Sequence, residues 1–151
     1  MYEFPKIKVE AELTLVNGES INGSLFVTDD LVSAEGNPRI EEYLNDDPDT
    51  FFSFQVADGG YRLINKAHLV SARVGQDDAE TRHQTPLSPR ELTLHLATGD
   101  AVSGAVYPTL MEETRVSDII NQEEAFLVLF QDGKKLVINR EQIISVSELD
   151  G

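Results

Sequence analysis

Short stretches of alternating apolar and polar residues, separated by glycine-containing turns, dominate the chain and predict β-strands. Glu10 to Leu15 alternate with the period of two that is expected of a half-buried strand. Asn17-Gly18 then predicts a tight hairpin turn, because both residue types tolerate positive backbone torsion angles. The returning strand is predicted at residues 21–27. It contains Gly23, and glycine inside a strand marks a bulge or a sharp bend.

A short helix and three further strands are predicted to follow this hairpin. Ile40, Tyr43 and Leu44 fall on one face of a helical turn. We expect the helix to end at Asn45, because asparagine tolerates the left-handed conformation of a helix C-terminus. The three strands are predicted at residues 50–56, 61–64 and 68–74, with Asp58-Gly59 forming the turn between the first two.

The same order of segments occurs twice along the chain. Residues 13–26 match residues 94–107, and each copy has two glycines five positions apart. Residues 39–45 match residues 115–121, and residues 58–71 match residues 132–145. Three matching blocks in the same order indicate an internal duplication. The last three strands of the second copy are accordingly predicted at residues 125–130, 134–138 and 142–146.

A polar segment separates the two copies. Residues 75–89 contain two prolines, few apolar residues and no periodicity, which is typical of a linker. We therefore divide the chain into a first β-barrel repeat at residues 1–74, a polar linker at 75–89 and a second β-barrel repeat at 90–151. The predicted fold class is mainly β, with two tandem five-stranded small barrels that each carry one short helix between strands 2 and 3.

Each copy resembles the Sm-like small β-barrel, and SH3-like barrels share the same features. The stretch Leu13 to Leu25, with its glycines, resembles the first Sm motif, and Leu63 to Val70 resembles the second. The resemblance implies RNA binding through an Asp-x-x-Met-Asn stretch and an Arg-Gly pair. Here Asp29-Asp30-Leu31-Val32 lacks the asparagine and Asn65-Lys66 replaces Arg-Gly, so no RNA-binding residue can be carried over. The pattern is also similar to uncharacterised bacterial proteins with duplicated barrels.

The composition excludes several classes of function. The chain has 12 Lys and Arg against 27 Asp and Glu, a formal net charge of −15, and no cysteine. Binding to nucleic acid or to an anionic membrane surface needs clustered cations, and neither half of the chain has a basic excess. The absence of cysteine excludes disulfides, thiol nucleophiles and cysteine-ligated metals. No secretory signal and no membrane span are visible, so a cytoplasmic location is expected.

Two polar pairs at matching positions are the first candidates for a functional role. Asn65-Lys66 and Asn139-Arg140 each follow an apolar strand and could present an amide and a cation at the rim of a barrel. Alternatively, the asparagine caps the tight turn before the last strand and the cation is solvated, which is the more common role of such residues.

Two arginines also occupy matching positions, at the start of the predicted helices. A cation at a helix N-terminus is electrostatically unfavourable, so Arg39 and Arg115 are each expected to reach a carboxylate or a carbonyl. A structural anchor is favoured over an anion site. Residues 45–49 are rich in aspartate but lack the glycine and glutamate of a calcium loop, and His68, His83 and His95 lie in different elements. No metal, cofactor or catalytic residue is therefore predicted.

The doubled aromatic residues favour packing against a second surface. Phe51 and Phe52 are adjacent in a predicted strand, so they point to opposite faces and cannot both enter one core. The second face packs either on the helix or on another barrel, from the same chain or from another copy. We predict a non-catalytic interaction module that binds a protein or peptide or associates with itself, with homo-oligomers left open. An Sm-like nucleic-acid-binding protein is the first alternative, and a small-ligand or Ca²⁺ sensor is the second.

Overall fold

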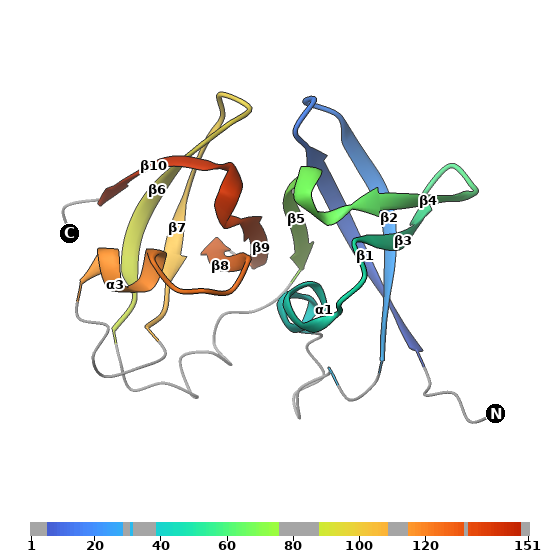
Figure 1. Cartoon of the computed structure of the whole chain (residues 1–151), viewed down its shortest axis with the longest axis horizontal. Coiled ribbons are helices and arrows are strands. Elements are labelled where there is room, and N and C mark those ends of the chain that lie inside the picture. Colours follow the sequence, from blue (N-terminus) through green and yellow to red (C-terminus); the bar gives the residue numbers. More distant parts are fainter. Residues whose placement is uncertain are drawn as a thin grey trace.

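The protein is mainly β, and its strands form one antiparallel sheet (Figure 1). The computed structural model describes residues 6–28, 31, 39–75, 88–108, 115–131 and 133–148. The first half comprises β1 (Lys6–Leu15), β2 (Ser20–Thr28), α1 (Ile40–Asp46), β3 (Phe51–Val56), β4 (Tyr61–Asn65), the 3₁₀ turn η2 (Lys66–His68) and β5 (Leu69–Gly75). The second half comprises β6 (Arg90–Leu96), β7 (Ala101–Val106), α3 (Val116–Ile120), β8 (Phe126–Gln131), β9 (Lys134–Asn139), η3 (Arg140–Gln142) and β10 (Ile143–Glu148).

The two halves have the same order of elements and the same order of strands in the sheet. In each half the fifth strand pairs with the first, followed by the second, third and fourth strands. A short helix lies between the second and third strands of each half, as predicted. The predicted strands are confirmed, although β1 begins at Lys6, before the predicted start at Glu10. The predicted linker lies mostly outside the described residues.

The sheet is continuous, and in this respect the prediction of two five-stranded barrels needs correction. The strands form one open ten-stranded sheet in the order β10-β6-β7-β8-β9-β5-β1-β2-β3-β4. The halves are joined because β5 of the first half pairs antiparallel with β9 of the second. The paired residues are Ser71 with Ile138, Ala72 with Val137, Arg73 with Leu136, Val74 with Lys135, and Gly75 with Lys134. We call this contact the β5·β9 junction.

The first hairpin turns on a single glycine. Only Gly18 in this turn has a positive φ, of 88°. The Gly18 amide donates to the Leu15 carbonyl at 2.9 Å, and the Leu15 amide donates to the Glu19 carbonyl at 2.9 Å. A positive φ was also predicted for Asn17, and this prediction was wrong. The Asn17 side chain instead accepts a hydrogen bond from the Glu19 amide at 3.0 Å, which stabilises the turn locally.

The helices do not end on left-handed asparagines, and the prediction that they would was wrong. No described non-glycine residue has a positive φ. Helix α1 continues to Asp46, and the Asn121 side chain donates to the Ser117 carbonyl at 2.8 Å. The Ser117 carbonyl also accepts from the Asn121 backbone amide at 3.1 Å, so the asparagine closes the end of α3 with both its backbone and its side chain, without a left-handed reversal.

Gly23 and Gly104 allow the third strand of each half to cross close to the second. A Cβ atom at Gly23 would collide with the Gln55 carbonyl oxygen, and one at Gly104 would collide with the Phe130 carbonyl oxygen. Strand β2 pairs with β3 only at Gly23 and Ser24. Close backbone approach is therefore the reason for glycine at these positions. The pairing of β1 with β2 passes Gly23 without a bulge, and the expected sharp bend stays a prediction.

Replacing Gly23 with alanine should destabilise the protein by about 1–3 kcal/mol, because β3 must move away from the added methyl group. Urea unfolding of Gly23→Ala measures the change. Gly75→Ala is the matched control, because no atom lies within 4 Å of a Cβ at that position. Equal midpoints for the two variants would contradict this explanation of why the position requires glycine.

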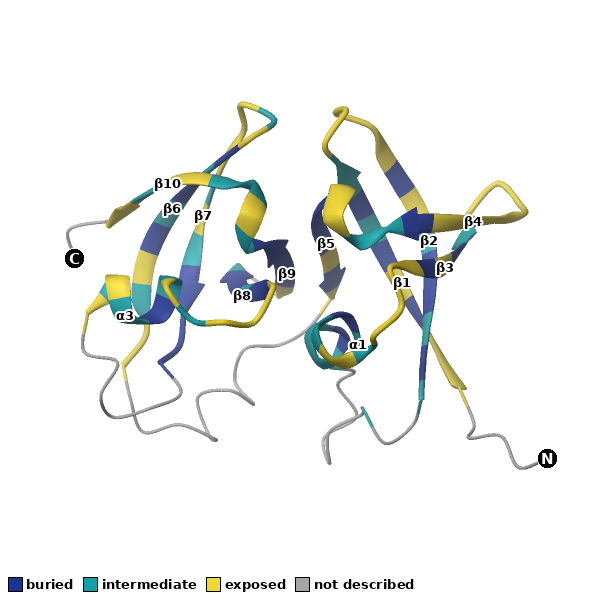
Figure 2. Ribbon diagram, viewed as in Figure 1, coloured by how far each residue is buried: buried dark blue, intermediate teal, exposed yellow. Residues whose placement is uncertain are grey.

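Two large apolar clusters form the core, and each contains residues of the other half. The first cluster is built on Leu13, Leu25 and Phe54 but also includes Phe126 and Val137 from the second half. The second cluster includes Val70 from the first half, packed with residues such as Leu92, Leu129 and Ile138. Figure 2 shows the resulting band of buried residues where β8, β9 and β5 meet. The halves therefore bury apolar surface in each other.

Candidate functional site

The two asparagines singled out in the sequence cap the 3₁₀ turns. The Asn65 side chain accepts a hydrogen bond from the Ala67 amide at 2.9 Å, and the Asn139 side chain accepts one from the Glu141 amide at 3.1 Å. Asn139 additionally donates across the junction to the Lys66 carbonyl at 3.3 Å. Both asparagines thus have a structural role, and that of Asn139 links the two halves.

The two cations that follow these asparagines bind backbone carbonyls. Lys66 Nζ donates to the Asp47 carbonyl at 2.7 Å, in the segment after α1. The Arg140 guanidinium donates to the carbonyls of Ile119 and Ile120 at 3.2 and 3.1 Å, and to the Glu124 carbonyl. These carbonyls lie at the end of α3 and beyond it, where the helix leaves acceptors free. The cations are therefore hydrogen-bonded rather than solvated.

Arg39 and Arg115 each reach a carboxylate in the first turn of the helix they precede. Arg39 pairs with Glu42 at 3.1 Å, and Arg115 pairs with Asp118 at 3.1 Å. Asp118 also accepts from the Arg115 backbone amide at 3.1 Å. Hydrogen bonds from the Arg115 side chain are the main cause of the lowered pKa of Asp118. Each arginine thus contacts a carboxylate, as expected, and this carboxylate belongs to the residue three positions later in the sequence.

The described residues contain no group of three or more metal-ligating side chains. In the aspartate-rich segment, Asp47 accepts a hydrogen bond from the Asp49 amide at 2.9 Å, which is an ordinary turn. His95 contacts the Ser147 hydroxyl at 3.0 Å, far along the chain from His68. Asp29 and His83 lie outside the described residues.

The β5·β9 junction contains polar contacts as well as apolar ones. The Phe126 amide donates to the Asn45 side chain at 2.9 Å, which fixes the end of α1 against the start of β8. Lys135, which is fully buried, forms an ion pair with Glu41 of α1 at 2.7 Å. Gln142 donates to the Ala67 carbonyl at 3.3 Å, so the η2 turn is held by the second half. A buried charge is tolerated here because it has a close carboxylate partner.

Removing the carboxylate of Glu41 should destabilise the protein by about 3 kcal/mol, because the buried Lys135 ammonium loses the carboxylate that lies 2.7 Å from it. Thermal or urea unfolding of Glu41→Ala measures this change. Glu42→Ala is the matched control on the same helix. Its ion pair with Arg39 is about 40% exposed on both sides, so it should cost less than about 1 kcal/mol. A control as unstable as Glu41→Ala would contradict the role of the buried pair.

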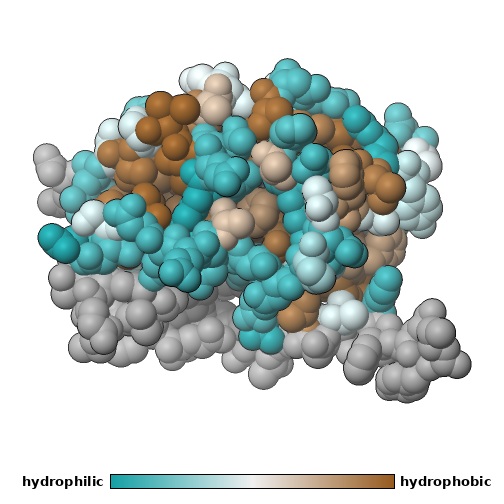
Figure 3. All heavy atoms as spheres, viewed as in Figure 1, coloured by the Kyte–Doolittle hydropathy of each residue, from teal (hydrophilic) through white to brown (hydrophobic). Residues whose placement is uncertain are grey.

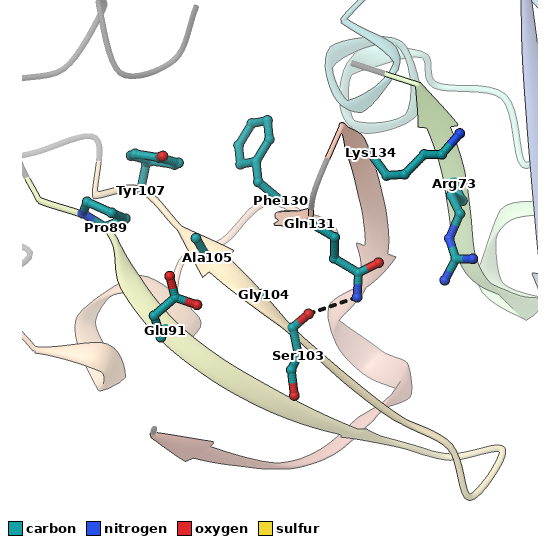
Figure 4. A pocket seen from close by; sticks show the side chains of 10 residues that line it. All are labelled: Arg73, Pro89, Glu91, Ser103, Gly104, Ala105, Tyr107, Phe130, Gln131 and Lys134. Atoms are coloured by element: carbon teal, nitrogen blue, oxygen red, sulfur yellow. Dashed lines mark hydrogen bonds between the residues drawn. The ribbon is translucent and has the colours of Figure 1, made fainter. Parts of the chain in front are cut away.

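A shallow groove lies beside the junction and has polar walls of mixed charge (Figure 4). Arg73 and Lys134 approach it from the two halves, while Glu91 lies toward the opposite side. The Gln131 side chain donates to the Ser103 carbonyl at 2.8 Å, and the rings of Tyr107 and Phe130 meet edge to face at 5.5 Å. Charges of both signs and an open shape do not define a binding site for an ion of either sign.

The two outer strands of the sheet carry the most exposed large apolar side chains. Strand β4 ends the described sheet on one side and β10 ends it on the other. Leu63 and Tyr61 of β4 are 69% and 67% exposed, and Ile144 of β10 is 70% exposed. In Figure 3 the hydrophobic atoms gather toward the two sides where Figure 1 places β10 and β4. Edge strands with apolar side chains favour pairing with another chain.

An apolar groove of about 350 Å³ runs beside β4. Its apolar lining includes Val16, Phe51 and Leu63, and its polar lining includes Asn65 and His68. Arg62 donates to both carboxylate oxygens of Glu19 at 2.9 and 3.3 Å beside it. This hydrogen bonding is the main cause of the lowered pKa of Glu19. We call this feature the β4 groove.

The edge residues were missed in the sequence, although a signal for one of them was present. The adjacent pair Phe51 and Phe52 indicated a second apolar surface, and Phe51 is indeed 49% exposed while Phe52 is 2% exposed. Leu63 matches Val137 in the repeat, and Ile144 matches Val70. These matches become informative only when the burial of the two valines is known.

The fold and these surfaces define a mainly-β protein with one ten-stranded antiparallel sheet and two apolar edges. No protein-family model, no curated protein and no solved structure matches the chain. None of the helices in the described part of the chain is long and apolar enough to cross a membrane.

Proposed function

We propose that this chain is a non-catalytic, cytoplasmic interaction module that binds protein through the outer edges of its sheet. The observation that carries the proposal is the exposure of Leu63 on β4 and Ile144 on β10, at 69% and 70%. These side chains lie on strands that have one neighbour each within the described sheet. A partner that adds a strand would gain backbone hydrogen bonds and bury the apolar side chains together.

The edge strands lack two of the features that natural proteins use to prevent strand addition, proline and lysine, while β4 carries Arg62 and β10 carries a bulge and Glu148. Such features include proline, lysine and inward-pointing charges on the edge strand. Strand β4 reads Tyr-Arg-Leu-Ile-Asn and β10 reads Ile-Ile-Ser-Val-Ser-Glu, without proline or lysine in either. The bound segment would also cover the β4 groove, whose walls are apolar. Both features support a protein ligand in an extended conformation.

We further infer that each half is a small five-stranded unit of the Sm-like or SH3-like kind, with the units at residues 1–74 and 90–151 joined by a linker at 75–89. The identical strand order of the halves supports this, and so does the glycine in the second strand of each, where the third strand approaches closely. The net charge of −15 argues against the nucleic-acid binding that such a fold implies elsewhere.

A photoreactive amino acid placed at position 63 or at position 144 should form adducts with protein, because these side chains lie on the proposed binding edges. The same amino acid at Ser88, which is exposed but outside the strands, is the control. Mass spectrometry identifies the partner peptide. The purified partner should then bind the wild-type chain and the Ser88→Glu variant, but bind Leu63→Glu or Ile144→Glu at least tenfold more weakly.

Adducts with nucleic acid instead of protein would overturn the proposal in favour of the Sm-like alternative. Equal adduct formation at position 88 would overturn it as well, because binding would then not involve the edges.

A further inference from the structure

The β5·β9 junction pairs two kinds of strand, and the same two kinds lie unpaired at the ends of the sheet. Strand β5 is the fifth strand of the first half, and its counterpart in the second half is β10. Strand β9 is the fourth strand of the second half, and its counterpart in the first half is β4. The ends of the molecule are therefore the two complementary sides of a contact that the chain already makes internally.

Burial differs at these matching positions in the manner expected of an unfilled interface. Val70 and Val137 are both 0% exposed, and each belongs to the apolar cluster of the opposite half. Their counterparts, Ile144 and Leu63, are 70% and 69% exposed. The counterparts are also larger apolar side chains than valine, so exposing them in a free chain is unfavourable.

A bulge directs the fifth strand's apolar residue outward in both halves. The pairing of β1 with β5 passes from Leu69 to Ser71 with a shift, so Val70 is the additional residue. The pairing of β6 with β10 shifts in the same way between Ile143 and Ser145, around Ile144. A bulge re-aims a side chain relative to the strand. Ile144 thus has the same local backbone irregularity that accompanies the burial of Val70 in the neighbouring half.

The β4 groove has the polar features that receive a 3₁₀ turn at the junction. In the second half, Asn139 and Gln142 donate to carbonyls of the η2 turn, at 3.3 Å each for Lys66 and Ala67. The matching residues of the first half are Asn65 and His68, which both line the β4 groove. The matching turn, η3, follows β9 and precedes β10. The groove therefore presents, at the matching positions, the kind of polar side chains that contact the η2 turn in the junction, and η3 is the turn that would lie against them.

We propose that copies of this chain join head to tail, with β10 of one copy pairing antiparallel with β4 of the next. The proposal rests on the proposed function and names its partner as a second copy of the chain. Transferring the register of the junction places Ser145 opposite Ile64, Val146 opposite Leu63 and Ser147 opposite Arg62. Such a contact repeats, so it produces a closed ring or an open filament.

The new contact does not require a buried charge. The counterparts of the Lys135 and Glu41 ion pair are Tyr61 and Ser117, which are both neutral. The main electrostatic term is then the repulsion between copies that each carry a net charge of −15. Added salt screens this repulsion and strengthens the association. Binding to nucleic acid would weaken with salt instead.

Sedimentation and light scattering on single-edge variants test the head-to-tail contact. Wild type should form species larger than one chain over a series reaching about 100 μM, and more so at higher salt. Leu63→Glu disables β4 and Ile144→Glu disables β10, so each variant alone should be a monomer, with association at least about 30-fold weaker than that of wild type. Both side chains are exposed, so at a concentration low enough for wild type to be monomeric these variants should unfold at the wild-type midpoint. Ser88→Glu should assemble normally.

An equimolar mixture of Leu63→Glu and Ile144→Glu provides the decisive measurement. One variant retains β10 and the other retains β4, so the mixture should form pairs of chains and nothing larger. A mixture that stays monomeric, a wild-type chain that stays monomeric, or an Ile144→Glu variant that dimerises alone through two β4 strands would each overturn the proposal. Edge-dependent binding of another protein by a monomeric wild-type chain would overturn self-association and leave the proposed function intact.

Introduced cysteines test the register, since the chain has no cysteine of its own. The Arg62→Cys and Ser147→Cys double variant places thiols on directly opposite residues and should form disulfide-linked multimers on mild oxidation. The control is Arg62→Cys with Ser145→Cys, which is two residues out of register. Equal cross-linking of the two double variants would contradict the transferred register.

Discussion

The pairing of β5 with β9 holds this structure together as one sheet instead of two. It connects strands from halves that are far apart in sequence, and it does so with backbone hydrogen bonds, which are indifferent to side-chain identity. The side chains then add selectivity, because Val70 and Val137 each complete the apolar cluster of the opposite half. A half of this size has little core of its own, so it gains stability from such an exchange.

The polar residues at the junction fix the orientation of the two halves relative to each other. Asn45 fixes the end of α1 to the start of β8, and the ion pair of Lys135 with Glu41 places a buried charge at one defined position. An ion pair in a buried site contributes little net stability but penalises alternative arrangements in which one charge is unpartnered. Lys66 and Arg140 first suggested a binding rim, but they also have a structural role, because each donates hydrogen bonds to backbone carbonyls.

An internal contact between two related units leaves complementary surfaces at the ends of the chain. Each unit has a fourth-strand side and a fifth-strand side, and the internal junction uses one of each. The remaining pair, on β4 and β10, keeps its apolar residues although the free chain does not bury them. The proposed functional surface is therefore a consequence of the architecture and needs no separate catalytic or metal-binding group.

The sequence by itself determined the local structure: the strands, the position of each helix and the two strand positions that require glycine. These follow from short-range effects, namely alternating polarity, turn propensity and the absence of a Cβ atom at Gly23 and Gly104. It also showed that three blocks of the first half recur in the same order in the second half. It did not determine which edges pair, since backbone hydrogen bonds carry no sequence label. Val70 and Ile144 occupy matching positions, and only the tertiary structure decided that one is buried by a neighbouring strand while the other remains exposed.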